Sequence, residues 1–460
     1  MGNCNASTTK NNETNIPNKS NDKDKIDEYF NILCDSSNSL EARKEAFQVL
    51  RNHYVPNKSS TQEYSHEVSR VFAERYITWP LNPQSSTGNK RRLADSIRGI
   101  IFGAAVGDSA GLATEFLSKA VIESHYFRDN QLFNFIPGCE VFPDMHRVSF
   151  TAGDWTDDTD QLILALISLL EDGGSIKPLT FAKHLNDWRE KGFVGLGDQG
   201  GCGLGRSTKA VIEHSQFLTD PLVASKDIWE RSGKKLAANG ALMRTAITAI
   251  PQFWDLDVVK ENTINLCMTT HYDPRCQASC LYFTFIIARL LQYWFEPDCV
   301  SPMPIEKLVV VLEECYSAAE NHLVQSLQTQ NEVETIIEEK KLEFSSYAHF
   351  QEIRSKEISD LQLDDAVSMG YTLKCLSVAI FSLLQAAEHG MSFPQLMQMI
   401  IREGGDADTN ATVAGALLGA YYGVRVIPAE WLDAMPYEMW LEAWVQKVLF
   451  MLQLPPCRPL

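Results

Sequence analysis

Apolar residues from about residue 94 onward repeat at the spacing of helices rather than strands. Ile97, Ile100 and Ile101 share one helical face, and the apolar run 162–170 ends at the glycine pair 173–174. The same pattern predicts helices around 209–216, 256–268, 277–294, 305–343, 370–388, 393–402, 409–422 and 429–452. Alternating patterns typical of strands are scarce. We therefore predict an all-α fold, a compact bundle of many helices.

The residues before this domain differ from it in composition and in hydrophobic pattern. Residues 1–25 are rich in Asn, Lys, Ser and Thr and contain almost no large apolar side chains, which predicts a disordered N-terminal tail. Helical spacing returns within 26–80, and Pro, Ser and Gly then gather before residue 94. The expected organisation is a tail over 1–25, a helical extension and linker over 26–93, and one large domain over 94–455.

Two further patterns bear on packing and on surface. Glycines stand four residues apart at Gly103 and Gly107, and again at Gly415 and Gly419, which predicts close helix packing inside the bundle. The stretch 328–360 is polar and charged, and it is most simply a solvated helix with its hairpin. A surface that binds a partner is the alternative interpretation of this stretch.

Composition narrows the functional classes. Lys and Arg number 41 and Asp and Glu number 59, giving a net charge of −18. Such a chain has no general attraction for nucleic acid or anionic membranes, so no direct nucleic-acid partner is expected. The 11 cysteines are scattered without a CxxC pair, as expected of reduced thiols in an intracellular, cytoplasmic protein.

The N-terminus carries no apolar segment of a secretory signal, and no apolar run approaches the length of a membrane span. The start of the chain leaves one alternative open. Gly2 could be myristoylated and Cys4 palmitoylated, which would give a weak membrane anchor. The usual pattern places Ser or Thr where Ala6 stands, which argues against it.

An acidic cluster, WTDDTD over 155–160, stands at the predicted start of a helix. One or two of these residues are explained as a helix cap, since Thr and Asp accept hydrogen bonds from free N–H groups there. Three carboxylates between Asp157 and Asp160, with Asp154 beside them, exceed that need. Like charges this close repel, and a bound divalent cation would offset the repulsion.

The second cluster, GGDADT over 404–409, repeats the arrangement 249 positions later along the chain. Its glycines permit a tight turn, and Asp406, Asp408 and Thr409 can then address one point before an apolar helix. Carboxylates and hydroxyls are hard oxygen ligands, which suit Mg²⁺ or Mn²⁺ far better than zinc or copper. Two such clusters meeting in space predict a centre of two divalent ions and a hydrolase.

Other polar segments in the domain are candidate parts of a site. Glu115 ends a helix of small residues, and a glycine-rich loop occupies 195–208. That loop nearly spells a phosphate-binding P-loop, but Arg206 stands in place of Lys and no strand pattern precedes it, so we discount an ATPase. NGALMR over 239–244 and THYDP over 270–274 are two further loop-to-helix junctions.

Taken in order, these segments resemble the ADP-ribosylglycohydrolase family, which includes the dinitrogenase reductase-activating glycohydrolases and the ADP-ribosyl-acceptor hydrolases. The resemblance covers roughly residues 95–425. The matching motifs are GAAVGDSAGLATEF (103–116), WTDDTDQ (155–161), the loop 195–208, NGALMR (239–244), THYDP (270–274) and GGDADTNATVAGALLGAYYG (404–423). It implies a compact, orthogonal all-α bundle holding two Mg²⁺ or Mn²⁺ ions.

The resemblance also implies a role for each matching residue. The metal ligands would be Thr156, Asp157, Asp158, Asp406, Asp408 and Thr409. Glu115 would act as general base or orient the attacking water, with Asp157 and Asp158 also catalytic. The substrate-binding residues would be Asn239, Gly240, Ala241 and His271, the first three around the phosphates and His271 on the cleft wall.

The expected reaction is cleavage of the glycosidic bond between ADP-ribose and an acceptor, such as an ADP-ribosylated protein side chain or another ADP-ribose conjugate. Two alternatives remain open. One is a non-catalytic ADP-ribose-binding or structural protein on the same fold, and the other is a metal-dependent hydrolase of another nucleotide-like substrate. The sequence leaves the acceptor linkage, the choice between Mg²⁺ and Mn²⁺ and the oligomeric state undetermined.

Overall fold

The computed structural model describes residues 90–128, 133–296 and 299–452, together with Ala42 and Leu454. The α-helices are α4 (Lys90–Gly111), α5 (Lys119–Tyr126), α6 (Asp157–Glu171), α7 (Pro178–Lys191), α8 (Arg206–Ile212), α9 (Pro221–Arg231), α10 (Leu256–Met268), α11 (Pro274–Tyr293), α12 (Ile305–Thr329), α13 (Glu334–Ala348), α14 (Phe350–Arg354), α15 (Thr372–His389), α16 (Phe393–Ile401), α17 (Ala407–Tyr422), α18 (Ala429–Asp433) and α19 (Glu438–Met451). The 3₁₀ helices are η2 (Arg147–Ser149), η3 (Val194–Leu196), η4 (Asn239–Ala249), η5 (Ile358–Leu361) and η6 (Val424–Val426).

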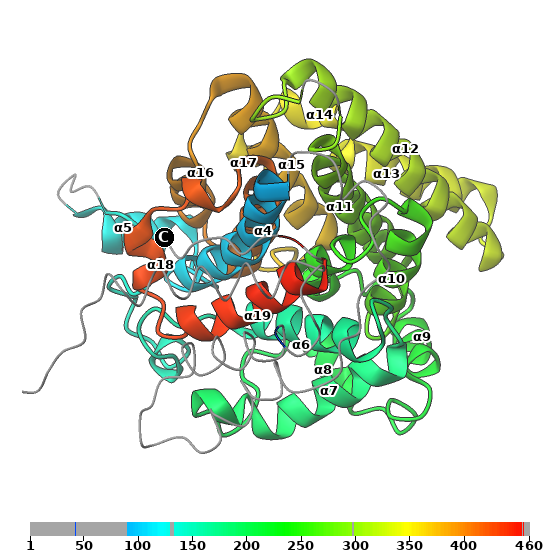
Figure 1. Ribbon diagram of the computed structural model, residues 1–460. Helices are drawn as coiled ribbons and strands as arrows, with labels where there is room; N and C mark the ends of the chain where they lie inside the picture. The colour runs from blue at the N-terminus through cyan, green and yellow to red at the C-terminus, as the bar shows by residue number, and fades with distance from the viewer. Residues whose placement is uncertain (1–41, 43–89, 129–132, 297–298, 453, 455–460) are drawn as a thin grey trace, which may run out of the picture.

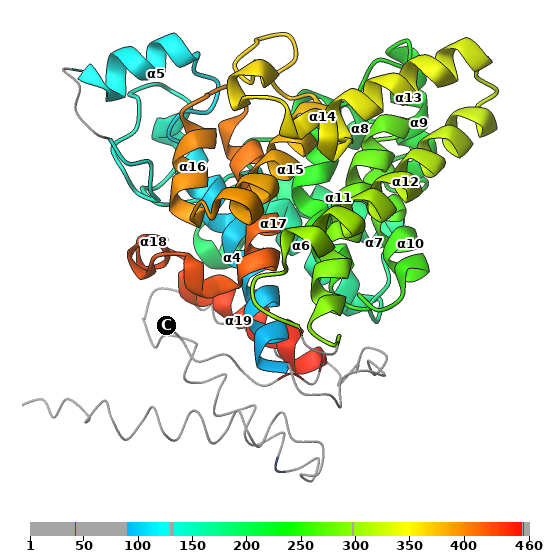
Figure 2. The same ribbon diagram turned by 90° about the horizontal axis from the view of Figure 1, so that it is seen from above.

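Helices α4 and α17 lie side by side at the centre of the fold, as both views show (Figures 1 and 2). Glycines permit the approach, because a Cβ added at Gly103 would overlap the backbone carbonyl of Gly415, and one added at Gly107 would overlap that of Ala411. The sequence prediction of close packing at these glycines is borne out by their contacts. The pairing carries the C-terminal end of α4 to the N-terminal end of α17.

We expect the Gly415→Ala substitution to lower the free energy of unfolding by about 3 kcal/mol, because overpacking a close helix contact forces both backbones apart. The new Cβ would overlap the carbonyl of Gly103, and rigid backbone cannot yield as a side-chain tip would. Urea unfolding of the metal-free protein measures the change. Gly205→Ala is the control, since its Cβ would meet no atom within 4 Å. Equal stability of the two variants would contradict the packing argument.

The remaining core forms around α11, which is buried over nearly its whole length and packs against α10, α12 and η4. At the other end of α4, the buried guanidinium of Arg98 donates two hydrogen bonds, 2.9 and 2.7 Å long, to one carboxylate oxygen of Glu442 on α19. This ion pair fastens the C-terminal helix to the central pair. The helical layers therefore converge on α4 and α17.

The all-α prediction is confirmed for the described part of the chain, where no strand occurs and the one β-bridge joins Ala238 to Tyr371. The helix expected over 305–343 is wrong as a single element: it is two helices, α12 and α13, because the chain turns at Asn331, whose φ is +57°. The helix expected over 429–452 is likewise interrupted between α18 and α19.

The sequence reading overlooked α5, α7 and α9, which are short or polar amphipathic helices. The predicted tail over 1–25, and nearly all of the extension and linker over 26–93, fall outside the described residues; α4 itself begins at Lys90. None of the helices in the described part of the chain has the length and hydropathy of a membrane span.

Candidate active site

The first acidic cluster forms the N-terminal turn of α6. Thr156 is the capping residue, and its hydroxyl accepts a hydrogen bond from the Asp158 amide at 3.4 Å. Asp108, near the end of α4, also stabilises this turn. Its carboxylate accepts hydrogen bonds from the amides of Thr156 and Thr159, both at 2.9 Å, and from the Thr159 hydroxyl at 2.7 Å. The caps therefore involve Thr156 and Asp108, which leaves the carboxylates of Asp157 and Asp158 available for other partners.

The second cluster forms the start of α17. Gly404 and Gly405 have φ values of +71° and +66°, the left-handed region that glycine enters without strain. A Cβ at Gly405 would overlap the Leu363 carbonyl, so this turn also requires glycine for space. The Gly405 carbonyl accepts a 2.6 Å hydrogen bond from the Phe116 amide, and this contact places the adjacent Glu115 beside the turn. Asp408 then lies in the first turn of α17.

The two clusters meet. The Thr156 hydroxyl donates a 3.3 Å hydrogen bond to a carboxylate oxygen of Asp408, although 252 positions separate them in the sequence. Carboxylate oxygens of Glu115, Asp406 and Asp408 all lie within 4.8 Å of one another. The structure thus brings the acidic residue at the end of the first motif to the same point as both aspartate clusters.

Burial and mutual repulsion dominate the electrostatics of this carboxylate cluster, which we define as Glu115, Asp157, Asp158, Asp406 and Asp408. Burial is the first cause that raises the pKa of Asp157 and Asp408 well above the usual value, and the charge of Glu115 is the second. Burial followed by the charge of Asp108 likewise raises the pKa of Asp158. Burial and Glu115 raise the pKa of Asp406 to about 6. Each ionised carboxylate of the cluster therefore disfavours ionisation of its neighbours.

The donor atoms of the cluster fit a divalent cation. One carboxylate oxygen of Asp158 and one of Asp408 are buried without a hydrogen-bond partner in the described chain. Buried carboxylate oxygens are rarely left unpaired, since desolvation without a partner is costly. Hard oxygen atoms at these spacings are the ligands that Mg²⁺ and Mn²⁺ accept, and both ions suit them equally.

Glu115 is held by residues that the sequence did not reveal. A ring nitrogen of His146 lies 2.5 Å from its carboxylate. The buried guanidinium of Arg147 donates to the carbonyls of Ala113 and Glu115, which fixes the backbone that presents the side chain. His146 and Arg147 lie in a segment with no regular pattern, and only their charges could have drawn attention to it.

Asp157 is also supported from behind. Gln161, one helical turn later, donates a 2.6 Å hydrogen bond to its carboxylate, and the buried Arg244 donates to Gln161 at 2.6 Å. Arg244 ends the NGALMR motif, so this motif supplies a support for the cluster as well as a loop. The glycine-rich loop 195–208 also lies next to Asp157, because a Cβ at Gly203 would lie 2.5 Å from an Asp157 carboxylate oxygen.

The predicted substrate-binding residues fall beside the cluster. Asn239 donates a 2.8 Å hydrogen bond from its amide to Asp406. A Cβ at Gly240 would lie 3.2 Å from the His271 ring, so these two residues are in contact. The second ring nitrogen of His271 is buried without a partner in the described chain, whereas Ala241 is fully buried and offers no side-chain surface.

Burial and the charge of Arg244 lower the pKa of His271 to about 3, so the ring is neutral at physiological pH.

Asp160 differs from its neighbours in the first cluster. Its carboxylate turns away and accepts the indole N–H groups of Trp155 at 2.8 Å and of Trp188 at 2.9 Å. In the sequence, Asp160 counts among the carboxylates that exceed the needs of a helix cap, and these two hydrogen bonds account for it; Asp160 is not among the predicted metal ligands.

The fold and the site together match a known class. A family model described as ADP-ribosylglycohydrolase matches residues 89–457, so the chain belongs to the ADP-ribosylglycohydrolase family. It is similar to the ADP-ribosylarginine hydrolase Tri1 of Serratia proteamaculans, 24% identical over 363 residues that span 78% of this chain and 80% of that protein. The ADP-ribosyl-dinitrogen reductase glycohydrolase of Rhodospirillum rubrum is 22% identical over 349 residues, 74% of this chain and 90% of that protein.

A solved ADP-ribosylglycohydrolase-related protein complex contains a chain with the same fold. Its TM-score is 0.53 at 22% sequence identity, and the match covers 79% of this chain and 99% of that one. The likeness supports the all-α architecture.

Proposed function

We propose that this protein is a metal-dependent hydrolase that cleaves the glycosidic bond between ADP-ribose and an acceptor, releasing ADP-ribose. The observation that carries the proposal is the contact between Thr156 and Asp408, which joins the two acidic clusters around unpaired carboxylate oxygens. Two relatives, whose names assign them hydrolysis of ADP-ribosyl groups, support the substrate class.

The donors would be divided between two Mg²⁺ or Mn²⁺ ions, with Thr156, Asp157 and Asp158 on one side and Asp406, Asp408 and Thr409 on the other. When bound, such ions supply an acidified water and positive charge for the ribose hydroxyls. Glu115 accepts the proton of the attacking water or orients that water, and His146 keeps its carboxylate in place. The aspartates stabilise oxocarbenium-like charge at the anomeric carbon as the glycosidic bond breaks.

The substrate side of the site is formed by the start of η4. Amides at the beginning of a helix attract phosphate, which favours this segment as the part that binds the ADP-ribose phosphates. His271 is neutral and offers one unpaired ring nitrogen to a ligand group. These residues bind and orient the ADP-ribose.

We expect the purified protein to release ADP-ribose from a modified arginine or serine peptide in the presence of Mg²⁺, and to release none after removal of divalent ions with EDTA. Chromatography of free ADP-ribose and mass spectrometry of the peptide measure the two products. Binding of ADP-ribose without release of unmodified peptide from any linkage would show a reader instead. Release that is unaffected by EDTA would contradict the metal-dependent mechanism.

A further inference from the structure

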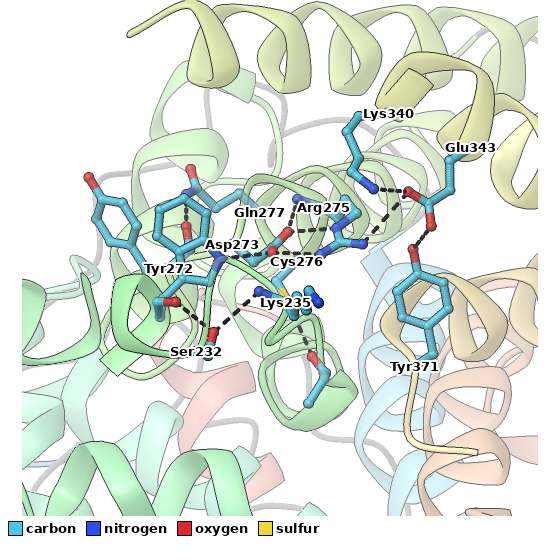
Figure 3. Close-up of polar contacts among 12 residues, drawn as sticks. Ser232, Lys235, Tyr272, Asp273, Arg275, Cys276, Gln277, Lys340, Glu343 and Tyr371 are labelled. Atoms are coloured by element: carbon cyan, nitrogen blue, oxygen red, sulfur yellow. Dashed lines mark hydrogen bonds and ion pairs between the residues drawn. The ribbon is translucent and has the colours of Figure 1, made fainter. Parts of the chain in front are cut away.

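Helix α13, in the polar stretch 328–360, presents one carboxylate to two other segments of the fold. Glu343 accepts a 2.6 Å hydrogen bond from the hydroxyl of Tyr371 and a 3.0 Å hydrogen bond from Lys340. The guanidinium of Arg275, at the start of α11, lies 3.7 Å from the same carboxylate. Figure 3 shows Glu343 between these three labelled side chains. Glu343 therefore joins α13 to the starts of α11 and α15.

The charge states of this group make the contacts strong. Burial acts to raise the pKa of Glu343, but the hydrogen bonds from Tyr371 and Lys340 and the charge of Arg275 outweigh it, and the pKa is lowered. Burial raises the pKa of Tyr371, so its hydroxyl keeps the proton that it donates. A hydrogen bond to an ionised acceptor is stronger than one between neutral groups.

Arg275 is itself fixed. It donates hydrogen bonds of 2.9 and 2.8 Å to the carboxylate of Asp273, which also accepts the indole N–H of Trp229 at 2.8 Å. Its guanidinium lies over the ring of Tyr371, 5.8 Å from the ring centre. The position of Tyr371 is thus defined both at its hydroxyl and at its ring face.

The backbone around Tyr371 continues the connection toward the carboxylate cluster. Residues 370–372 run antiparallel to residues 237–239, the segment that opens η4. The backbone amide of Asn239 donates a 3.0 Å hydrogen bond to the Gly370 carbonyl. The backbone amide of Thr372 donates one of 3.0 Å to the Ala237 carbonyl. The backbone of Tyr371 is therefore tied directly to that of Asn239.

Asn239 completes the chain of contacts. Its side-chain amide donates the 2.8 Å hydrogen bond to Asp406 described above. Gly370 also abuts Asp406, because a Cβ there would lie 3.3 Å from the Asp406 carboxylate. The packed turn 404–405 places the backbone of Asp406, and the contacts with Asn239 and Gly370 act on its carboxylate.

We propose that Glu343 and Tyr371 are positioning residues for Asp406, acting through the paired backbone of 237–239 and 370–372 and through the Asn239 amide. The proposal rests on the proposed function, in which Asp406 is a metal ligand. Partners that orient a ligating carboxylate determine how well a metal is bound. The polar stretch 328–360 thereby gains a role: its helix α13 supports the metal centre.

The test is Mn²⁺ binding to the full chain, measured from the electron paramagnetic resonance signal of free Mn²⁺, which needs no turnover. We expect Asn239→Ala to raise the Mn²⁺ dissociation constant about 10- to 100-fold, and Tyr371→Phe to raise it about three- to tenfold. The control is Tyr347→Phe, the same change on α13 in a ring that packs edge-on against Tyr371; it should leave binding unchanged. Glu343→Ala should reproduce the loss seen in Tyr371→Phe.

A double variant distinguishes the proposed route from a general loss of structure. If Tyr371 acts through Asn239, Tyr371→Phe combined with Asn239→Ala binds Mn²⁺ no more weakly than Asn239→Ala alone. Additive losses, or Mn²⁺ binding by Tyr371→Phe equal to that of the wild type, would overturn the positioning role. A melting temperature measured in EDTA identifies a variant that fails to fold, in which case Glu343→Ala decides. Failure of the wild-type protein to bind Mn²⁺ would instead overturn the proposed function, and the positioning role with it.

Discussion

Replacing Asp408 by Asn is expected to remove glycosidic-bond cleavage while making the metal-free protein more stable. The carboxylate of Asp408 contacts the Thr156 hydroxyl and shares its surroundings with Glu115 and Asp406. Loss of this ligand should lower kcat/KM by more than about 100-fold, since even a partner of a ligand is worth 10- to 100-fold. The neutral amide also removes one of several buried charges that repel, and we expect a gain of about 1 kcal/mol.

The two effects have opposite signs, which makes the outcome specific. Release of ADP-ribose measures the activity, and urea unfolding in EDTA measures the stability. The matched control is Asp187→Asn, the same change at an exposed carboxylate on α7, which should alter neither quantity. An Asp408→Asn variant that is inactive but much less stable would show that Asp408 holds the fold rather than an ion. Turnover near that of the wild type would exclude Asp408 as a ligand.

The second large effect is a change in stability with pH that divalent ions reverse. Burial and the charge of Glu115 raise the pKa of Asp406 to about 6, against a usual value of 3.8. Burial raises that of Asp108 to about 6 as well. A carboxyl with a raised pKa stabilises the folded state below its unfolded pKa and loses that contribution as pH rises through the folded value. In EDTA, the protein should therefore lose stability between about pH 4 and pH 6 from these two groups.

Mg²⁺ should offset this loss, because it binds the ionised carboxylate cluster, which includes Asp406, in the folded state alone. At a concentration 100 times the dissociation constant, the gain is about 2.7 kcal/mol. The gain should be larger at pH 7.5 than at pH 5, since protons compete with the ion for the same oxygens. Thermal unfolding across this range, with Mg²⁺ and with EDTA, measures it, and Asp408→Asn should show a shallower dependence. A gain from Mg²⁺ that does not vary with pH would place its binding outside the cluster.

Several features of the site could be predicted from sequence because they exceed what helix capping requires. Asp157 and Asp158 at the start of α6, and Asp406 and Asp408 at the start of α17, carry more charge than a helix N-terminus needs. Because such an excess is costly when buried, it indicates chemistry rather than local structure. The helical periodicity was equally direct for long apolar helices such as α11.

Other features depend on tertiary contacts that no local pattern encodes. The direction of the Asp160 side chain is decided by two indole donors, one of them from α7, a helix that the sequence reading overlooked. Asp108 supports α6 from the end of α4, 48 positions away. Glu343 lies in the stretch 328–360, interpreted from sequence as solvated, but its carboxylate accepts a hydrogen bond from Tyr371 at the start of another helix. Polar side chains that act on another segment are the ones that sequence patterns miss.

The pairing of α4 with α17 has a consequence for how the chain acquires its shape during synthesis. Gly103 on α4 contacts Gly415 on α17. The ribosome must therefore translate more than two thirds of the polypeptide before α4 can pack against α17. Until then the face of α4 that packs on α17 lacks its native partner, and contacts between such distant segments form slowly. The carboxylate cluster is completed equally late, because a chain that stops before residue 406 lacks both Asp406 and Asp408.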